Sequence, residues 1–360
     1  MVSINPKVSV IIVNYNGALF LDKLFSSLQT QTFKDFEVIF VDNASTDNSL
    51  EIVRSFAKKK DLDVKIVDLP NNYGFCRGSN IGFKYAKGMY IALLNNDTYV
   101  SQNWLEELVR TMDSDASIGI CQSKIIDLRN KRTVYGNFLG VYGKRKIGKH
   151  FKITDSLFEE AFYASGTALM IRRDLVEIMG YLFDDRQFTG DMDLSWRARL
   201  MGFRVVTNLR SICYHYQGHS SRMVLRNDVD VEYVVFKDQL RTFIKNYGLA
   251  HLFLRIPILL FIDFLNSIYA FIKTGSPVIY ALLRAILWNL YDLRGIWKDH
   301  IKTQTKRRIQ DGEIENYMLP YPAELYFFRL NYGKERRLDY LGTSKFWSER
   351  QIFEKQLHFS

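Results

Sequence analysis

Two carboxylate-bearing segments carry residue types suited to metal binding and proton transfer. The first, Asn95-Asn96-Asp97, follows an apolar run typical of a buried strand. Oxygen ligands two residues apart on an extended chain share one face, so Asn95 and Asp97 could hold a hard divalent ion, although such residues are also common in turns. The second segment places Asp191 and Asp193 before a predicted helix. Asp191 is the better candidate base, whereas Asp193 could simply complement the helix dipole.

Two weaker segments could bind an anion or complete a site. The glycine-containing stretch 71–82 precedes a predicted helix, where backbone N–H groups and Arg77 could contact a phosphate. It fits neither the GxGxxG nor the P-loop pattern, so an ordinary loop before a helix is the alternative. A predicted strand leads toward His215, which is followed by polar residues. An isolated histidine is more often structural than a ligand, so His215 matters only in combination with the other segments.

The elements that must position these residues follow an α/β pattern. In the first 125 residues, short runs rich in Val and Ile alternate with stretches of helical spacing, which is typical of βαβ units on a parallel, doubly wound sheet. Ligands of such sheets bind beyond the carboxyl ends of the strands, where the candidate residues lie. The predicted strands are 8–13, 37–42, 64–69, 89–95 and 118–125.

Residues 126–162 give a weaker signal, and order returns over 163–225. There the pattern predicts strands over 168–171 and 204–207, a helix beginning near Arg173 and another over 194–201. We expect a catalytic unit over 1–225, divided into a nucleotide-binding half (1–125) and an acceptor or catalytic half (126–225). A mainly helical region should follow over 226–360.

Length and composition describe a folded protein. The chain has 360 residues, of which 47% are hydrophobic and 24% charged, so disordered and fibrous classes are excluded. The net charge of +10 fits a membrane surface, a phosphorylated substrate or nucleic acid as partner. Cys76, Cys121 and Cys213 form no CxxC pair, so neither disulfides nor a structural zinc site is expected. Without a signal-peptide pattern, the expected location is the cytoplasm.

The basic charge is concentrated in residues 241–310, which contain eleven Lys and Arg against three Asp and no Glu. This window includes the apolar stretch 249–272, in which Asp263 makes membrane spanning unfavourable. A helix lying on the cytoplasmic membrane surface, flanked by cations such as Lys245 and Lys273, is one interpretation. A buried core helix or a homodimer contact is the other, and the sequence leaves both open.

In their order along the chain, these segments resemble glycosyltransferase family 2, whose members have the nucleotide-sugar-binding GT-A fold. The resemblance covers about residues 6–222 and is most similar to rhamnosyltransferase-like enzymes of surface polysaccharide assembly. The motifs are VSVIIVNYNG (8–17), FEVIFVDNASTDNS (36–49), NNYGFCRGSNIGF (71–83), LLNNDT (93–98), SGTALMIRRD (165–174), GDMDLSWRARLMGFRV (190–205) and HYQGHSS (215–221).

The resemblance implies a donor side with a metal site. Asp97 would bind Mg²⁺ or Mn²⁺, His215 would complete the metal site, and Asn95 stands where the family motif begins, although its neutral amide is a weaker ligand. The residues assigned to the nucleotide-sugar donor are Asn14, Tyr15, Asp42, Asn43, Arg77 and Asn96.

On the acceptor side, the resemblance makes Asp191 the catalytic base. Asp193 and Trp196 are also assigned to this side. Gly190 departs from the family pattern, because many relatives carry an acidic residue there, and Asp193 could take over part of its work.

The function implied is metal-dependent, inverting transfer of a sugar from a nucleoside-diphosphate sugar, UDP- or dTDP-linked, to a hydroxyl of a glycan or lipid-linked acceptor. A base on one face of the anomeric carbon and a leaving group on the other give inversion. The alternative is a catalytically weak or inactive glycan-binding protein of the same fold. A nicotinamide-dependent oxidoreductase is disfavoured because no strand precedes GxGxxG, and no nucleic-acid partner is expected.

Overall fold

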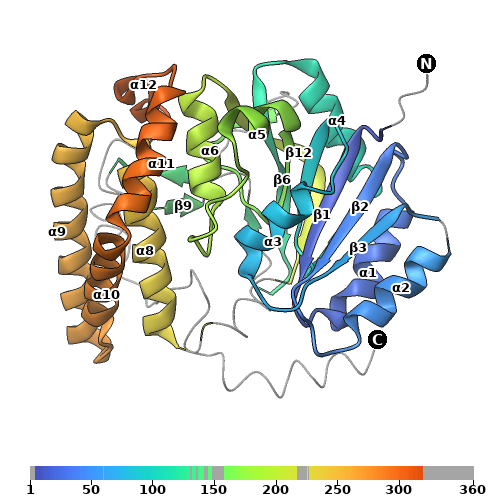
Figure 1. The fold of residues 1–360 in the computed structure, drawn as a ribbon, viewed down its shortest axis with the longest axis horizontal. Helices are drawn as coiled ribbons and strands as arrows, with labels where there is room; N and C mark the ends of the chain where they lie inside the picture. The colour runs from blue at the N-terminus through green and yellow to red at the C-terminus, as the bar shows by residue number, and fades with distance from the viewer. Residues whose placement is uncertain are drawn as a thin grey trace.

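The computed structural model describes residues 5–59, 61–129, 132–134, 137–141, 145–147, 158–216, 225 and 227–318. The part of the HYQGHSS motif after Tyr216, and the predicted C-terminal region beyond 318, lie outside the described residues. Within the described residues, the fold is the expected α/β fold with a mostly parallel central sheet and helices at the C-terminal end (Figure 1).

The central sheet has the strand order β10-β12-β6-β11-β4-β1-β2-β3. Strands β3, β2, β1 and β4 are parallel, β11 runs antiparallel between β4 and β6, and β6 is parallel to β12. Two short strands, β5 (Thr98–Val100) and β10 (Phe158–Glu160), pair with β12, and a third, β7 (Arg132–Val134), pairs with β6. Strands β8 (Asn137–Leu139) and β9 (Arg145–Ile147) pair with each other. The main strands are β1 Val8–Asn14, β2 Phe36–Asp42, β3 Val64–Asp68, β4 Tyr90–Leu94, β6 Ile118–Asp127, β11 Ala168–Arg172 and β12 Arg204–His215.

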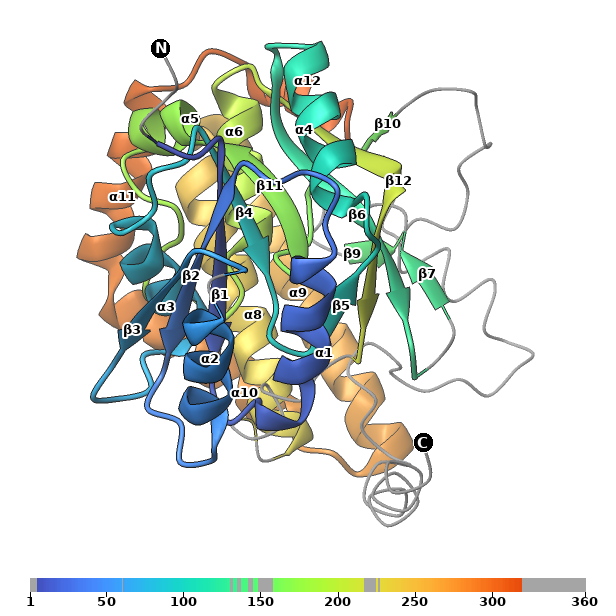
Figure 2. The same ribbon diagram turned by 90° about the vertical axis from the view of Figure 1, so that its right-hand side faces the viewer.

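Helices cover both faces of the sheet. Successive strand residues point to opposite sides, and the main strands carry apolar residues on both. In β1, Val10 and Ile12 face the core formed with α1 (Ala18–Gln29), α2 (Ser49–Lys58) and α4 (Trp104–Ser114). Ile11 faces the second core, under α3 (Gly74–Phe83), α5 (Arg173–Met179) and α6 (Asp191–Leu200). Figure 2 shows α1 and α2 in front of the sheet, with the C-terminal helices behind it.

The predicted strands are confirmed apart from one length. The sequence predicted that the last strand ends at Thr207, whereas β12 continues to His215. The register against β6 shifts between Asn208 and Ile212, so the residues in between form a bulge-like irregularity, after which the strand resumes. This continuation carries His215 to the edge of the sheet where β6 also ends.

The C-terminal helices are α8 (Asp228–Asn246), α9 (Leu249–Thr274), α10 (Val278–Tyr291), α11 (Leu293–Thr305) and α12 (Asp311–Glu315). Helix α8 packs directly on α6, because Phe243 and Tyr247 share a core with Trp196. In Figure 1 the group lies beyond α6, with α9 and α10 farthest from β3. The helical region is therefore continuous with the catalytic half at this contact.

Candidate functional site

The predicted site residues meet at one edge of the sheet. Strands β1, β2 and β4 are parallel, and β6 shares their direction because β11 is antiparallel to both β4 and β6. Strand β12 is parallel to β6. The carboxyl ends of all five strands therefore lie at the same edge, which brings together Asn14, Asp42, the segment after Leu94 and His215.

A buried hydrogen-bond network joins the ends of β1, β2 and β4. The Asn14 Nδ2 atom donates to Asp42 Oδ1 (2.9 Å) and Ser45 Oγ (3.0 Å), and Asn14 Oδ1 accepts from Asn96 Nδ2 (2.8 Å). Asp42 Oδ2 also accepts from the Ser45 backbone N–H (2.8 Å). Asn14, Asp42 and Asn96 are buried. Their hydrogen bonds fix the loops that follow β1, β2 and β4, and these three side chains are called here the floor of the site.

The loop after β1 passes unusually close to this floor. A Cβ atom on Gly17 would lie 2.3 Å from Asn14 Oδ1 and 2.4 Å from Asn96 Nδ2, so only glycine fits. Asn16 (φ 50°) and Ala44 (φ 60°) both adopt left-handed backbone conformations, which are costly for residues other than glycine. Sequence reasoning included Gly17 in the VSVIIVNYNG motif (8–17) but assigned it no role of its own.

Asn43 offers a polar atom to a ligand. Its Nδ2 atom donates to the Gly74 carbonyl (3.2 Å), but its buried Oδ1 atom has no hydrogen-bond partner among the described residues. A buried acceptor without a partner is costly, and a nucleoside donor group would satisfy it. Tyr15 is half-buried and follows Asn14, whose carbonyl accepts from the Asn43 backbone N–H (2.8 Å). Arg77 is exposed on α3, with its guanidinium 4.4 Å from the centre of the Tyr73 ring.

Asp97 and His215 form a close pair at the ends of β4 and β12. His215 Nε2 lies 3.0 Å from Asp97 Oδ1, and both side chains are nearly buried. The backbone holds this pair, because β5 pairs with β12 at Thr98 and His215, and the Tyr216 N–H donates to the Asp97 carbonyl (2.9 Å). Asn95 is half-buried, and its backbone N–H donates to the Thr167 carbonyl (2.9 Å).

The donor set at this pair fits a divalent ion that a ligand helps to hold. A carboxylate suits Mg²⁺ or Mn²⁺, whose remaining positions are often filled by water and substrate phosphates, whereas an imidazole suits transition metals and so favours Mn²⁺ over Mg²⁺. Among the described residues, no group of three His, Cys, Asp or Glu side chains is arranged to hold a metal ion. The residues therefore suit a metal that binds together with a diphosphate.

Asp191 lies near the same backbone segment that Asn95 contacts. Asp191 begins α6, is half-buried, and accepts from the Met192 backbone N–H through Oδ1 (2.9 Å). A Cβ atom on Gly166 would lie 3.8 Å from the Asp191 Cβ atom, while the neighbouring Thr167 carbonyl accepts from Asn95. Residues 165–167 thus touch both carboxylate segments.

With this geometry in view, residues 9–179 match Glycosyl transferase family 2. The match covers just under half of the 360 residues. A poly-beta-1,6-N-acetyl-D-glucosamine synthase of Staphylococcus epidermidis is 25% identical over 207 residues, which are 58% of this chain. This chain spans about half of that relative's length (49%) and 63% of the length of EpsH from Bacillus subtilis, which is 26% identical over 224 residues.

One solved structure shares the fold over most of the chain. TarS 1–349 of S. aureus in complex with UDP-GlcNAc has a TM-score of 0.58 and 18% identity, with 92% of this chain and 95% of that chain covered. At this level of identity the likeness shows the fold alone, which is the GT-A fold.

The departure at Gly190 has a packing cause. A Cβ atom on Gly190 would lie 2.5 Å from Cδ1 of the Phe183 ring and 3.1 Å from Cys76 Sγ. The space where the resemblance leads one to expect an acidic side chain is therefore occupied by Phe183. Burial, together with the Asp238 and Asp191 carboxylates, raises the pKa of Cys76 well above its usual value, so this thiol is a packing group.

The structure corrects the assignment of Asp193 to the acceptor side. Asp193 is fully buried, and its carboxylate accepts from Arg197 Nε (2.9 Å), Lys245 Nζ (3.1 Å) and Asn246 Nδ2 (2.9 Å). Burial alone would raise its pKa, but Lys245 and Arg197 outweigh burial and lower it. Asp193 is a structural ion that cannot reach an acceptor or replace the side chain missing at Gly190.

Trp196 is corrected in the same way. Its ring is fully buried and packs edge-on against Phe162, Phe243 and Tyr247 at centroid distances of 4.8 to 5.5 Å. All α6 residues from Met192 to Leu200 are buried, and Trp196 joins this helix to Phe243 of α8. Of the two carboxylates in this segment, only that of Asp191 is on a half-buried residue.

Sequence reasoning missed an aromatic cluster beside the Asp97 and His215 pair. Lys23 Nζ lies 3.9 Å above the Tyr99 ring and donates to the Tyr216 hydroxyl (3.3 Å), and Tyr99 stacks on Tyr214 at 4.7 Å. Burial raises the pKa of Tyr99. The alternation of Tyr214 and Tyr216 around His215 was the available signal, since alternate residues of a strand share one face.

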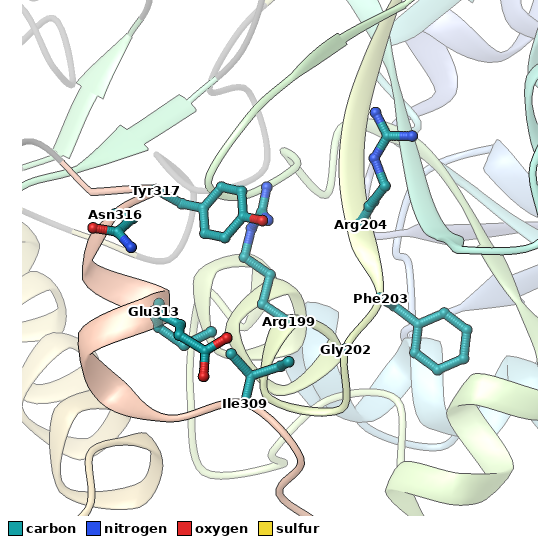
Figure 3. A pocket seen from close by; sticks show the side chains of 9 residues that line it. Arg199, Gly202, Phe203, Arg204, Ile309, Glu313, Asn316 and Tyr317 are labelled. Atoms are coloured by element: carbon teal, nitrogen blue, oxygen red, sulfur yellow. The ribbon is translucent and has the colours of Figure 1, made fainter.

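A pocket at the opposite edge of the sheet is separate from the site. It is lined by residues that include Arg199, Arg204 and Tyr317 (Figure 3). Arg204 begins β12 and His215 ends it, and twelve strand residues at about 3.3 Å each separate the two ends by roughly 35 Å. Arg199 donates to the Phe162 and Val205 carbonyls and lies 4.2 Å from the Tyr317 ring centre, so its guanidinium serves packing.

Proposed function

We propose that this protein transfers a sugar from a nucleoside-diphosphate sugar to a hydroxyl of a glycan or lipid-linked acceptor, in the assembly of a surface polysaccharide or glycoconjugate. The observation that carries the proposal is the arrangement around residues 165–167. Residues 165–167 contact both segments: the Thr167 carbonyl accepts from Asn95, two residues before Asp97 of the Asp97 and His215 pair, and Gly166 lies against Asp191. A cation site for a diphosphate and a carboxylate that can accept a proton, both beside one short segment, support such a transfer.

Asp191 is the base in this proposal. A sugar hydroxyl is a weak nucleophile at neutral pH, so Asp191 accepts its proton as the oxygen attacks the anomeric carbon. The bond from that carbon to the diphosphate oxygen breaks with the electron pair leaving on the diphosphate, and the configuration inverts. A divalent ion held by Asp97 and His215 would neutralise charge on the diphosphate. Arg77 supplies a further positive charge at the start of α3.

The related proteins support a nucleoside-diphosphate sugar as the donor. TarS was solved with UDP-GlcNAc, and a mannosyltransferase of Pyrobaculum calidifontis with the same fold (TM-score 0.51, 18% identity, 84% of this chain and 87% of that chain) with GDP-Man and Mn²⁺. We propose a UDP- or dTDP-linked donor, and a dTDP-linked deoxysugar would fit the rhamnosyltransferase-like resemblance. The acceptor is proposed only as a hydroxyl on a glycan or lipid carrier.

A thermal-shift screen tests the donor. UDP-, dTDP- and GDP-linked sugars are each added with and without Mn²⁺. A ligand present at one hundred times its Kd stabilises the folded state by about 2.7 kcal/mol. We expect the true donor to stabilise the protein more with Mn²⁺ than without it. If no nucleotide sugar raises the melting temperature, the proposed function is wrong.

Calorimetry with Asp97→Ala then tests the metal site. The variant should lose the part of donor affinity that depends on Mn²⁺, and loss of such a ligand or its support typically costs 10- to 100-fold in affinity. Equal donor affinity with and without Mn²⁺ in the unaltered protein would contradict the metal site. The matched control is Asp35→Ala, which removes an exposed carboxylate just before β2, at the opposite end of that strand from Asp42.

A catalytically weak glycan-binding protein is the second candidate, favoured by Gly190 and by the neutral amide of Asn95. The same screen separates the two functions. A sugar-transferring enzyme consumes the donor once an acceptor is present, whereas a binding protein is stabilised by glycan and leaves the donor intact.

A further inference from the structure

Helices α9 and α10 carry most of the exposed large apolar side chains of the described residues. Phe253 is 81% exposed and Ile272 is 74% exposed. Monomeric soluble proteins rarely expose apolar patches of this extent without a partner. The side chains of this surface, called here the apolar face, are Leu249, Phe253, Leu254, Phe261, Phe264, Leu265, Ile268, Tyr269, Phe271 and Ile272 of α9, and Tyr280, Leu283, Leu287, Leu290 and Tyr291 of α10.

Three acidic or uncharged polar residues of these two helices face inward. Asp263 is 7% exposed, Ser267 is fully buried, and Asn289 is buried with its Nδ2 atom donating to the Lys237 carbonyl of α8 (3.2 Å). A helix on the surface of a water-soluble domain has the opposite arrangement, with its apolar residues inside. Helices α9 and α10 are therefore arranged for an apolar medium on their outer side.

The exposed charges beside the apolar face are positive. Lys273, Arg284, Arg294 and Lys298 are exposed on α9, α10 and α11. The acidic residues of these three helices are turned inward: Asp263 is buried, and Asp292 and Asp299 accept from Arg241 Nη1 (2.7 Å) and Nη2 (3.0 Å). An apolar surface bordered by cations complements an anionic lipid surface. Exposed Tyr280, Tyr291 and Trp297 are residue types enriched at the membrane interface.

Contacts with the rest of the chain indicate that α9 lies along a membrane. By length and composition, Leu249–Lys273 could cross a bilayer. However, Leu259 is buried in a core shared with Phe243 of α8, and Arg255 forms two hydrogen bonds with Glu315 (2.9 and 2.7 Å). Figure 1 shows α9 at the edge of the molecule farthest from β3, and few residues of its most apolar stretch are buried. A spanning α9 would have to draw this packed body into the lipid.

We propose that the apolar face of α9 and α10 inserts into the interfacial layer of an anionic membrane, with Lys273, Arg294 and Lys298 at the lipid headgroups. The proposal is independent of the proposed function, because it rests on the polarity of α9 to α11 and not on the site at the strand ends. It would bring the site close to acceptors carried on lipid.

Vesicle flotation with the full chain tests the proposal. The vesicles contain either phosphatidylcholine alone or a 70:30 mixture with phosphatidylglycerol, at physiological salt. We expect the protein to float with the mixed vesicles and to bind them less tightly as salt rises. Protein that stays at the bottom of the gradient with both vesicle types would overturn the proposal. The apolar face would then be covered by a second copy or by another part of the chain.

Two variants separate the apolar and charged contributions. The triple change Phe253→Ser, Phe261→Ser and Ile272→Ser should lower vesicle partitioning by more than about 100-fold, since each buried apolar side chain contributes strongly. The double change Arg294→Glu and Lys298→Glu should lower it by about 10- to 100-fold on anionic vesicles only. Met89→Ser, an exposed apolar residue elsewhere, and the double change Lys58→Glu and Lys84→Glu are the matched controls.

Two further measurements keep the result interpretable. Near-ultraviolet circular dichroism of each variant must match that of the unaltered protein, which excludes misfolding as the cause of lost binding. Light scattering of the lipid-free protein gives its mass. A dimer that the triple variant converts to a monomer, together with unchanged flotation of that variant, would assign the face to a second copy and overturn the membrane proposal.

Discussion

The carboxylates of Asp191 and Asp193, two residues apart on α6, have different surroundings. At the start of the helix, half-buried Asp191 uses one oxygen on the next backbone N–H and faces the site. Two residues later, Asp193 is enclosed by Arg197, Lys245 and Asn246. Both carboxylates belong to the same sequence motif. Their neighbours, supplied largely by α8, make the first available for chemistry and the second a structural ion.

Charged residues of α8 also fix the segment that precedes Asp191. With Asp184 and Asp193 they form a buried set of ion pairs, called here the ion cluster. Lys245 bridges Asp193 and Asp184 (3.1 and 2.9 Å), and Arg241 donates to Asp184 (2.6 Å). Asp238 Oδ2 of α8 accepts from the backbone N–H groups of Phe188 and Thr189, both at 2.8 Å, just before the helix begins. The C-terminal helices therefore position the base, although they lie far from it in sequence.

The largest expected effect is on turnover. Asp191→Asn keeps the shape and the contact to the Met192 N–H but cannot accept a proton, so kcat should fall by about 10²- to 10⁴-fold. Donor affinity should stay nearly unchanged, as measured by calorimetry. Near-normal turnover in this variant would remove Asp191 from the role of base.

The matched change in the ion cluster should act on stability. Asp193→Ala leaves Arg197 and Lys245 without one of their buried carboxylates, and removing one partner of a buried ion pair typically costs about 3–5 kcal/mol. Urea denaturation followed by tryptophan fluorescence measures this loss in the free energy of unfolding. Asp191→Asn is the control and should change the free energy of unfolding little. Equal stability of the two variants would erase the proposed distinction.

A third change tests whether the space beside the base is closed. Gly190→Asp forces a side chain against the Phe183 ring, and overpacking of this kind costs about 1–3 kcal/mol. We expect a lower melting temperature and no gain in turnover. The double change Gly190→Asp with Phe183→Ala opens the space and should recover part of the stability lost to the clash. A stable single variant with raised turnover would show that the position tolerates the family's usual acidic residue.

The smallest effect is the dependence of stability on pH. Burial alone would raise the pKa of Asp184, but Lys245 and Arg241 outweigh burial and hold it well below its usual range. A carboxyl with a lower pKa in the folded state contributes stability above its unfolded pKa, and loses it as pH falls through the folded value.

Denaturation at several pH values tests this dependence. The free energy of unfolding should change little through this group above about pH 5, and should decline below about pH 4 by up to about 1.4 kcal/mol per pH unit for one proton. Asp184→Asn should be less stable at neutral pH and show a shallower decline. A decline of the same steepness in the variant would assign the acid sensitivity to other groups.

Much of the fold could be predicted because its signals are local. The apolar runs of β1, β2 and β4 are continuous, as expected for strands covered on both faces, and the residues after them fall at one edge by the geometry of parallel sheets. The end of β12 could not be predicted, since an irregularity at Asn208 interrupts its pattern before the strand resumes.

By itself, the sequence determined the order of strands and helices, the segments that carry Asp97 and Asp191, and the resemblance to family 2. These properties depend on residue type and short-range spacing. The tertiary structure alone decided that Asp193 and Trp196 are buried, that Phe183 closes the space at Gly190, and that the polar side of α9 faces inward. Burial and charge compensation depend on residues from distant parts of the chain, such as Lys245 beside Asp193, and no local pattern records which distant neighbour a side chain will meet.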